Sequence, residues 1–239
     1  MSDFLLFTVG FIVALFTVWK LSKEKLYSER VVFDAVILIS LLTLVCSRVF
    51  YVLFHFEQFG FNILKWIVVG LYPGMSIGGA LIGAGLALWF LSDKKTVVPF
   101  PELVDVLTRT FLYVAPLLLV GMLFFSPELG NVWGITIPVL NKQIATHSIT
   151  GYRLLSILIL LGVMGFFFRR KLTLASGTYS AVVWLLFIVS YFLIDFMKAN
   201  DVYYWKLSVD QWIYSILILI IAIILFFQVK QKAFLKPKK

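Results

Sequence analysis

Five polar side chains fall inside or beside long apolar segments, where polar groups are costly. Arg48 and Asp195 lie within such segments, and His147, Tyr152 and Arg153 lie where another one begins. A charged group at the middle of a membrane helix costs about 2.5–3.5 kcal/mol on insertion scales, so each is a functional candidate. A guanidinium is a planar fork that can donate two hydrogen bonds to a phosphate. We therefore predict a pocket for a lipid phosphate, with Arg48 or Arg153 as the phosphate ligand. A buried Arg48–Asp195 ion pair among ordinary interfacial residues is the alternative interpretation.

Glycine recurs through the apolar stretch 73–90, at positions 74, 78, 79, 83 and 85. This spacing of small residues lets two membrane helices approach closely, because no side chain separates their backbones. The pattern is common in membrane proteins and by itself indicates helix packing rather than chemistry. We therefore expect this stretch to form a helix that packs tightly against a neighbour.

The composition places these residues in a membrane protein. Of the 239 residues, 62% are hydrophobic and 14% are charged, and the mean hydropathy is +1.00. A soluble domain of this size cannot hide so much apolar surface. The apolar runs are continuous rather than alternating, which favours helices over a β-barrel. We predict an all-α integral membrane protein in which residues 1–239 form a single transmembrane domain, without a metal or other cofactor.

Seven apolar stretches are long enough to span a bilayer, which takes about 20 residues. They lie at roughly 4–22, 33–55, 74–92, 104–126, 152–168, 176–197 and 209–229. The shorter apolar piece Phe61–Tyr72 carries Asn62 and Lys65 and is predicted to be an interfacial segment. Lysine and arginine are concentrated after the first, third, fifth and seventh stretches, and such an excess marks the cytoplasmic side. The predicted topology has the N-terminus outside and the C-terminus inside, so the net charge of +9 is an orientation signal rather than a nucleic-acid surface.

Five segments carry short motifs in a fixed order along the chain. The most specific is Gly74–Gly83, which reads GMSIGGALIG. The other four are Ser47–Phe54, Thr146–Tyr152, Phe192–Asp201 and Val209–Gln211. In this order they resemble the motifs of the prolipoprotein diacylglyceryl transferase family: an arginine-bearing segment ending in YVLF, then GMSFHGGLIG, RHPxQLY, a helix before a QPD-like turn, and a final motif containing GQ. The resemblance covers most of the chain.

This resemblance implies a multi-pass enzyme of the bacterial inner (cytoplasmic) membrane. Members of the family move diacylglycerol from phosphatidylglycerol to a lipobox cysteine, so the implied partners are a phosphatidylglycerol-like phospholipid and a prolipoprotein signal peptide. The cysteine thiol attacks a glyceryl carbon, and glycerol phosphate leaves. Such a reaction needs a more nucleophilic thiol, since a free cysteine is only a few per cent thiolate near pH 7. It also needs positive charge beside the departing phosphate.

Residue by residue, the resemblance assigns matching or near-matching positions to the site. These are Arg48, His147, Tyr152, Asp195 and Gln211, with Arg153 in place of a family glutamate. On this basis His147 is the expected base, and the expected lipid and phosphate site consists of Arg48, Tyr152, Arg153, Asp195 and Gln211. Arg48 or Arg153 is expected to hold the phosphate.

Three motif positions differ from the family pattern. Gly78 stands in place of the motif histidine, Met122 stands where an arginine is expected, and Tyr191 replaces the arginine of the sixth stretch. These differences leave a second hypothesis open, in which the chain is a catalytically inactive homologue that binds lipid or serves as a membrane partner subunit.

Overall fold

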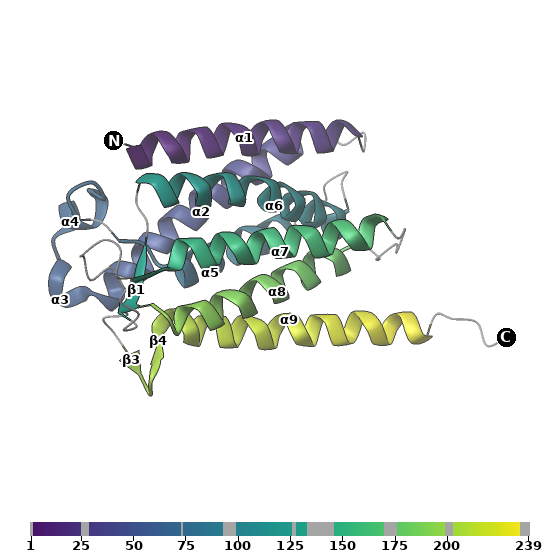
Figure 1. Cartoon of the computed structure of the whole chain (residues 1–239). Coiled ribbons are helices and arrows are strands. Elements are labelled where there is room, and N and C mark those ends of the chain that lie inside the picture. Colours follow the sequence, from purple (N-terminus) through teal and green to yellow (C-terminus); the bar gives the residue numbers. More distant parts are fainter. Residues whose placement is uncertain are drawn as a thin grey trace, which may run out of the picture.

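The computed structural model describes residues 2–24, 29–72, 74–92, 99–125, 128–132, 146–169, 176–198 and 203–234. Within these ranges the chain is nearly all helical, and the long helices run side by side (Figure 1). The helices are α1 (Ser2–Glu24), α2 (Glu29–Phe54), α3 (Phe56–Phe59), α4 (Ile63–Ile67), α5 (Ile77–Ser92), α6 (Phe100–Phe125), α7 (Ile149–Arg169), α8 (Thr178–Asp195) and α9 (Val209–Phe234). The strands are β1 (Leu129–Val132), β2 (Thr146–Ser148), β3 (Tyr203–Tyr204) and β4 (Leu207–Ser208).

The prediction of a helical, multi-pass membrane protein is confirmed. Each of the seven predicted stretches overlaps a helix, and five helices among the described residues are long and apolar enough to cross a membrane: α2, α6, α7, α8 and α9. Helix α5 is shorter, with 16 residues. The number of seven spans and the orientation of the chain stay predictions.

One end of the bundle carries α3, α4 and the four strands, at the left of Figure 1. We call it the loop-rich end. There β1 pairs with β2 and β3 pairs with β4, both antiparallel. These short pairings were not predicted, because strands of two to four residues carry too little sequence pattern to be recognised. At this end α2, α6 and α8 finish and α5, α7 and α9 begin.

The glycine-rich helix α5 packs against α2 as the spacing of its small residues predicted. A Cβ built on Gly79 would lie 2.8 Å from the Cys46 carbonyl oxygen, and one built on Gly83 would lie 2.3 Å from that of Leu42. Both distances are too short for a real side chain. The two backbones can therefore approach this closely only because these positions are glycine.

The opposite end of the bundle is held by a carboxylate that caps a neighbouring helix. Helix α8 begins at Gly177, which has no side chain to satisfy the first amide groups of the helix. Asp105 of α6 supplies the acceptors instead: its Oδ2 accepts from the Gly177 amide at 2.9 Å and its Oδ1 from the Ser180 amide at 3.1 Å. The buried Asp105 thus joins α6 to the start of α8.

Candidate functional site

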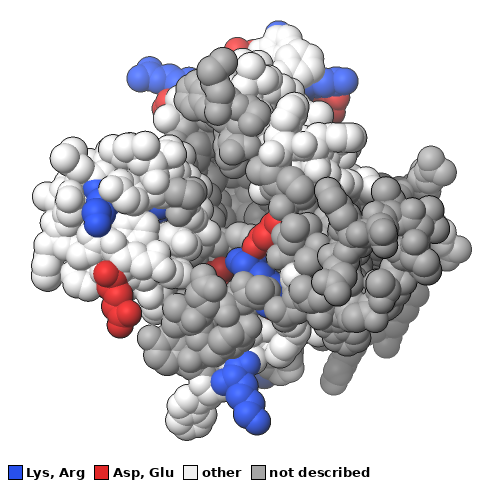
Figure 2. All heavy atoms as spheres, turned by 60° about the vertical axis from the view of Figure 1, so that its left-hand side comes forward, with Lys and Arg blue, Asp and Glu red and all other residues white. Residues whose placement is uncertain are grey.

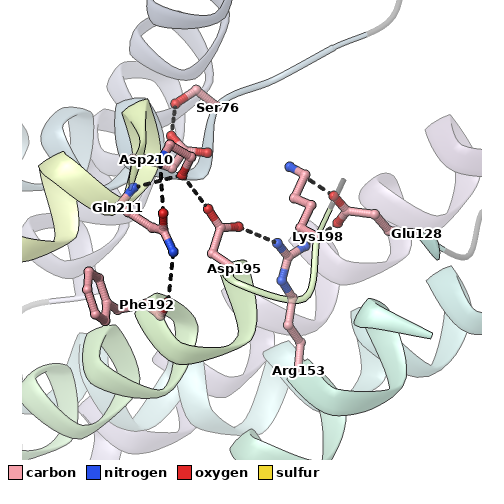
Figure 3. Close-up of polar contacts among 10 residues, drawn as sticks. Ser76, Glu128, Arg153, Phe192, Asp195, Lys198, Asp210 and Gln211 are labelled. Atoms are coloured by element: carbon pink, nitrogen blue, oxygen red, sulfur yellow. Dashed lines mark hydrogen bonds and ion pairs between the residues drawn. The ribbon is translucent and has the colours of Figure 1, made fainter. Parts of the chain in front are cut away.

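A cluster of charged side chains lies at the loop-rich end, around the guanidinium of Arg153 in the second turn of α7 (Figure 3). Its Nη1 donates to Oε2 of Glu128, and its Nη2 lies 3.8 Å from Oδ1 of Asp195. Lys198 completes the cluster, with its Nζ 2.9 Å from Oε1 of Glu128. The guanidinium also lies over the ring of Tyr191, 5.2 Å from its centroid. Arg153 is 5% exposed and Asp195 is 2% exposed, so this is a buried ionic cluster.

Backbone contacts between distant segments bring these charges together. The Glu128 carbonyl accepts from the Ile149 amide at 2.9 Å, and the Glu128 amide donates to the Thr150 hydroxyl at 2.9 Å. Gly130 of β1 forms an isolated antiparallel bridge with Lys198. A Cβ on Gly130 would lie 2.3 Å from the Met197 carbonyl oxygen, so glycine is required for this contact. The start of α7 and the end of α8 are thereby joined through the short segment after α6.

The charges of Glu128 and its neighbours are mutually stabilising. Burial alone would raise the pKa of Glu128, but the positive charges of Arg153 and Lys198 and their hydrogen bonds lower it below its usual range. Glu128, Asp195, Arg153 and Lys198 together comprise two negative and two positive groups. The charges of these four side chains therefore balance within the cluster.

Asp195 is also tied to the first turn of α9. The Ser208 hydroxyl donates to Asp195 Oδ2 at 2.7 Å. Ser208 and Gln211 bond each other reciprocally: the Ser208 amide donates to Gln211 Oε1 at 2.8 Å, and the Gln211 amide donates to the Ser208 hydroxyl at 3.1 Å. This is the capping box that the spacing Ser-x-x-Gln produces at a helix N-terminus. Gln211, which is 1% exposed, thus orders the start of α9 beside Asp195.

A third carboxylate, Asp210, joins the first turn of α9 to the start of α5 (Figure 3). Its Oδ1 accepts from the Ser76 hydroxyl at 2.6 Å and from the Gly78 amide at 3.1 Å. The Ser76 hydroxyl accepts in turn from the Gly79 amide at 2.9 Å. Asp210 therefore satisfies amide and hydroxyl donors where α5 begins.

Arg48 has a different set of contacts from the one expected. Its Nε, Nη1 and Nη2 donate to the carbonyl oxygens of Trp66, Gly74 and Lys65, each at 2.8 Å. Three of its five N–H groups therefore hold the chain between α2 and α5. Asp195 is paired with Arg153 instead, so the alternative of a buried Arg48–Asp195 pair is wrong.

The segment that Arg48 holds includes residues 61–72, which were predicted to be interfacial, and it combines a short helix with exposed apolar side chains. It contains α4, whose first turn is capped by Asn62, which accepts from the Leu64 amide at 3.1 Å. Large apolar side chains project from it with little cover, among them Phe61 and Leu71. Gly74, which ends the segment, has a φ of 139°, and a Cβ there would lie 2.1 Å from the Tyr51 ring. Only glycine fits this turn into α5.

The remaining predicted positions are distributed around the cluster. His147 lies in β2 directly before α7, and its side chain is outside the described part of the structure. Tyr152 precedes Arg153 on α7 and is half-buried. Three positions differ from the family motifs. Met122 packs against the apolar core, and the Tyr191 ring faces the guanidinium of Arg153. The Gly78 amide donates to Asp210 Oδ1.

Sequence reasoning missed four residues that the fold places in the site: Glu128, Lys198, Ser208 and Asp210. The spacing of Ser208 and Gln211 carried a usable signal, because Ser-x-x-Gln before an apolar run is typical of a capping box. Glu128 and Lys198 carried none, since they come from separate loops that only the fold brings together.

Figure 2, which shows the loop-rich end, has acidic and basic side chains adjacent in a depression near its centre.

The apolar helices and this buried ionic cluster define a multi-pass membrane protein with a charged site at one end of its bundle. The family model for prolipoprotein diacylglyceryl transferase matches residues 4–228. The chain therefore belongs to the prolipoprotein diacylglyceryl transferase family. It is also similar to a phosphatidylglycerol–prolipoprotein diacylglyceryl transferase of Finegoldia magna, with 23% identity over 232 residues, which cover 95% of this chain and 90% of the relative.

Proposed function

We propose that this chain is an active transferase that moves a diacylglyceryl group from phosphatidylglycerol to the cysteine thiol of a prolipoprotein signal peptide. The observation that carries the proposal is the buried Arg153, held between Glu128 and Asp195 in a member of this family. An ionisable group buried in a membrane protein is costly to place, which favours a functional role. The family match and this charged cluster favour the transferase over an inactive homologue.

We place the reaction at the loop-rich end. The excess of lysine and arginine near the opposite helix ends supports an orientation with the loop-rich end at the outer leaflet of a bacterial cytoplasmic membrane. The exposed apolar segment 61–72, held by Arg48, would then lie in the head-group region, where lipid and signal peptide must both enter. Arg48, Tyr152 and Gln211 shape the site in this proposal rather than bind the leaving group.

Arg153 and Lys198 are the cations proposed to stabilise the departing phosphate. Lys198 is the more accessible of the two, since its side chain is 25% exposed whereas that of Arg153 is 6% exposed. In this proposal Lys198 binds the lipid phosphate first, and the more deeply buried Arg153 stabilises its charge from inside the bundle. Glu128 bridges both cations before the lipid arrives and keeps them at a fixed separation. Such preorganised charge lowers the barrier because it need not rearrange as the phosphate departs.

The reaction is tested directly by mass spectrometry of a lipobox peptide. Purified protein in mixed micelles with phosphatidylglycerol should add the mass of one diacylglyceryl group to the peptide cysteine. A peptide with cysteine replaced by serine, and micelles that contain only phosphatidylcholine, serve as matched controls and should show no gain. Absence of a gain on the cysteine peptide, under conditions in which the Finegoldia magna relative produces one, would contradict the proposed function.

The expected base, His147, is examined with the same assay. If its imidazole accepts the thiol proton, the His147→Ala variant should lose activity by at least 100-fold, the scale of general base catalysis. Retained activity would remove His147 from that role and leave the transferase assignment intact.

A further inference from the structure

Three carboxylates at the loop-rich end, those of Glu128, Asp195 and Asp210, differ in their partners. Glu128 is paired with Arg153 and Lys198, and Asp195 is paired with Arg153. Asp210 has no cation within ion-pair distance among the described residues. Its Oδ1 accepts two hydrogen bonds, whereas its Oδ2 accepts none from the described part of the chain. Asp210 is therefore the carboxylate with an oxygen available to a substrate.

Asp210 also occupies the space above Gly78. A Cβ built on Gly78 would lie 2.7 Å from Asp210 Oδ1 and 2.7 Å from Ile213 Cδ1. Position 78 therefore cannot bear a side chain while Asp210 keeps its present place. The chain has a carboxylate, supplied by α9, at the point where a side chain on α5 would otherwise project.

Hydrogen bonds around the first turn of α9 place Asp210 beside the ionic cluster. The Ser208 hydroxyl donates to Asp195 Oδ2 at 2.7 Å, and Ser208 and Gln211, which flank Asp210 in the chain, bond each other. Asp210 therefore lies in the helix turn that Ser208 joins to Asp195, the ion-pair partner of Arg153.

We propose that Asp210 is the catalytic base of this enzyme and accepts the proton of the substrate thiol on its Oδ2. This inference rests on the proposed transferase function. The S–H bond breaks as the proton moves to Asp210, and the sulfur forms a bond to the glyceryl carbon. The carbon–oxygen bond to the phosphate breaks, and its electron pair leaves with the glycerol phosphate, whose charge Arg153 and Lys198 stabilise. Asp210 then releases the proton to water before the next turnover.

The hydrogen bonds to Oδ1 fit this role because they hold the carboxylate without using its second oxygen. The competing interpretation is that Asp210 only joins α9 to α5. The Asp210→Asn variant separates the two, since the amide oxygen can still accept from Ser76 and Gly78 but cannot take a proton near neutral pH.

The experiment measures kcat/KM for lipid transfer to the lipobox peptide from pH 4 to 9. Near pH 7, Asp210→Asn should lose at least 100-fold, as expected when a general base is removed. Its residual rate should rise about tenfold per pH unit toward pH 8.5, because it then follows the thiolate fraction of the free cysteine. The control is Glu57→Gln, the same chemical change at an exposed carboxylate of α3, which should match the wild type.

An Asp210→Asn rate within threefold of wild type, or a loss that high pH does not relieve, would each overturn the role of Asp210. An active wild type with any of these results leaves the transferase function standing. A wild type without activity contradicts the proposed function itself, and with it the base.

Discussion

Replacing Arg153 by glutamine removes the central cation of a buried cluster while keeping most of the side-chain volume. Glu128 would retain Lys198, at 2.9 Å, whereas Asp195 would lose the guanidinium that lies 3.8 Å from its Oδ1. Asp195 is 2% exposed, so water cannot replace the lost partner. Truncating one member of a buried ion pair costs about 3–5 kcal/mol, and we expect a loss of that size in the free energy of unfolding.

The chain offers a matched control at its surface. Lys23 lies 3.9 Å from Glu29, and their side chains are 56% and 49% exposed. A solvent-exposed pair of this kind contributes about 0–1 kcal/mol, so Lys23→Gln should leave stability nearly unchanged. The contrast between the two variants isolates the effect of burial from the effect of removing a positive charge.

The assay is unfolding in mixed micelles of increasing sodium dodecyl sulfate content, followed by tryptophan fluorescence. A double-mutant cycle with Asp195→Asn should return a coupling of about 1–3 kcal/mol between positions 153 and 195, since the two side chains share one network. A loss for Arg153→Gln within 1 kcal/mol of the loss for Lys23→Gln would refute the buried ionic cluster as a stabilised unit.

Three further predictions concern other parts of the structure. Gly83→Ala places a methyl group against the Leu42 carbonyl and should cost about 1–3 kcal/mol, whereas Gly85→Ala, with open space around it, should be neutral or stabilising in the same unfolding assay. Asp105→Ala removes the cap of α8 and should lower the free energy of unfolding by about 0.5–2 kcal/mol. An unchanged free energy of unfolding would contradict this role of Asp105. Folding lowers the pKa of Glu128, so the carboxylate contributes fully to the free energy of unfolding above the ordinary glutamate pKa and loses that contribution as pH falls through the lower folded pKa. The difference in the free energy of unfolding between wild type and Glu128→Gln should therefore shrink in that acidic range. A difference that does not change with pH would contradict the ion pairing of Glu128.

The long helices could be predicted from the sequence because a bilayer leaves few alternatives. An uninterrupted apolar run must satisfy its own backbone hydrogen bonds, which only a helix does. The close contact of α5 with α2 followed from its glycines for the same kind of reason, since Gly79 and Gly83 leave no side chain between the backbones. These are local properties, and each can be read within a single segment.

The site itself was only partly predictable. Arg153 and Asp195 stand out because each is an ionisable residue in an apolar setting, and both lie in the cluster. The partners of Arg48 could not be foreseen, because they are backbone carbonyls of a loop and have no signature in the sequence. Likewise, Gly78 reads as a missing side chain until the fold shows Asp210 in the space above it.

The most direct test of the whole account compares two lysines of the loop-rich end in the lipid-transfer assay. Lys198 belongs to the cluster, whereas Lys206 is exposed in the turn between β3 and β4. We predict that the wild type adds a diacylglyceryl group to the lipobox cysteine, that Lys198→Met raises KM for phosphatidylglycerol about tenfold or more, and that Lys206→Met leaves it unchanged. Equal KM values for both variants and the wild type would contradict the placement of the reaction at the cluster, and no transfer by the wild type would contradict the transferase itself.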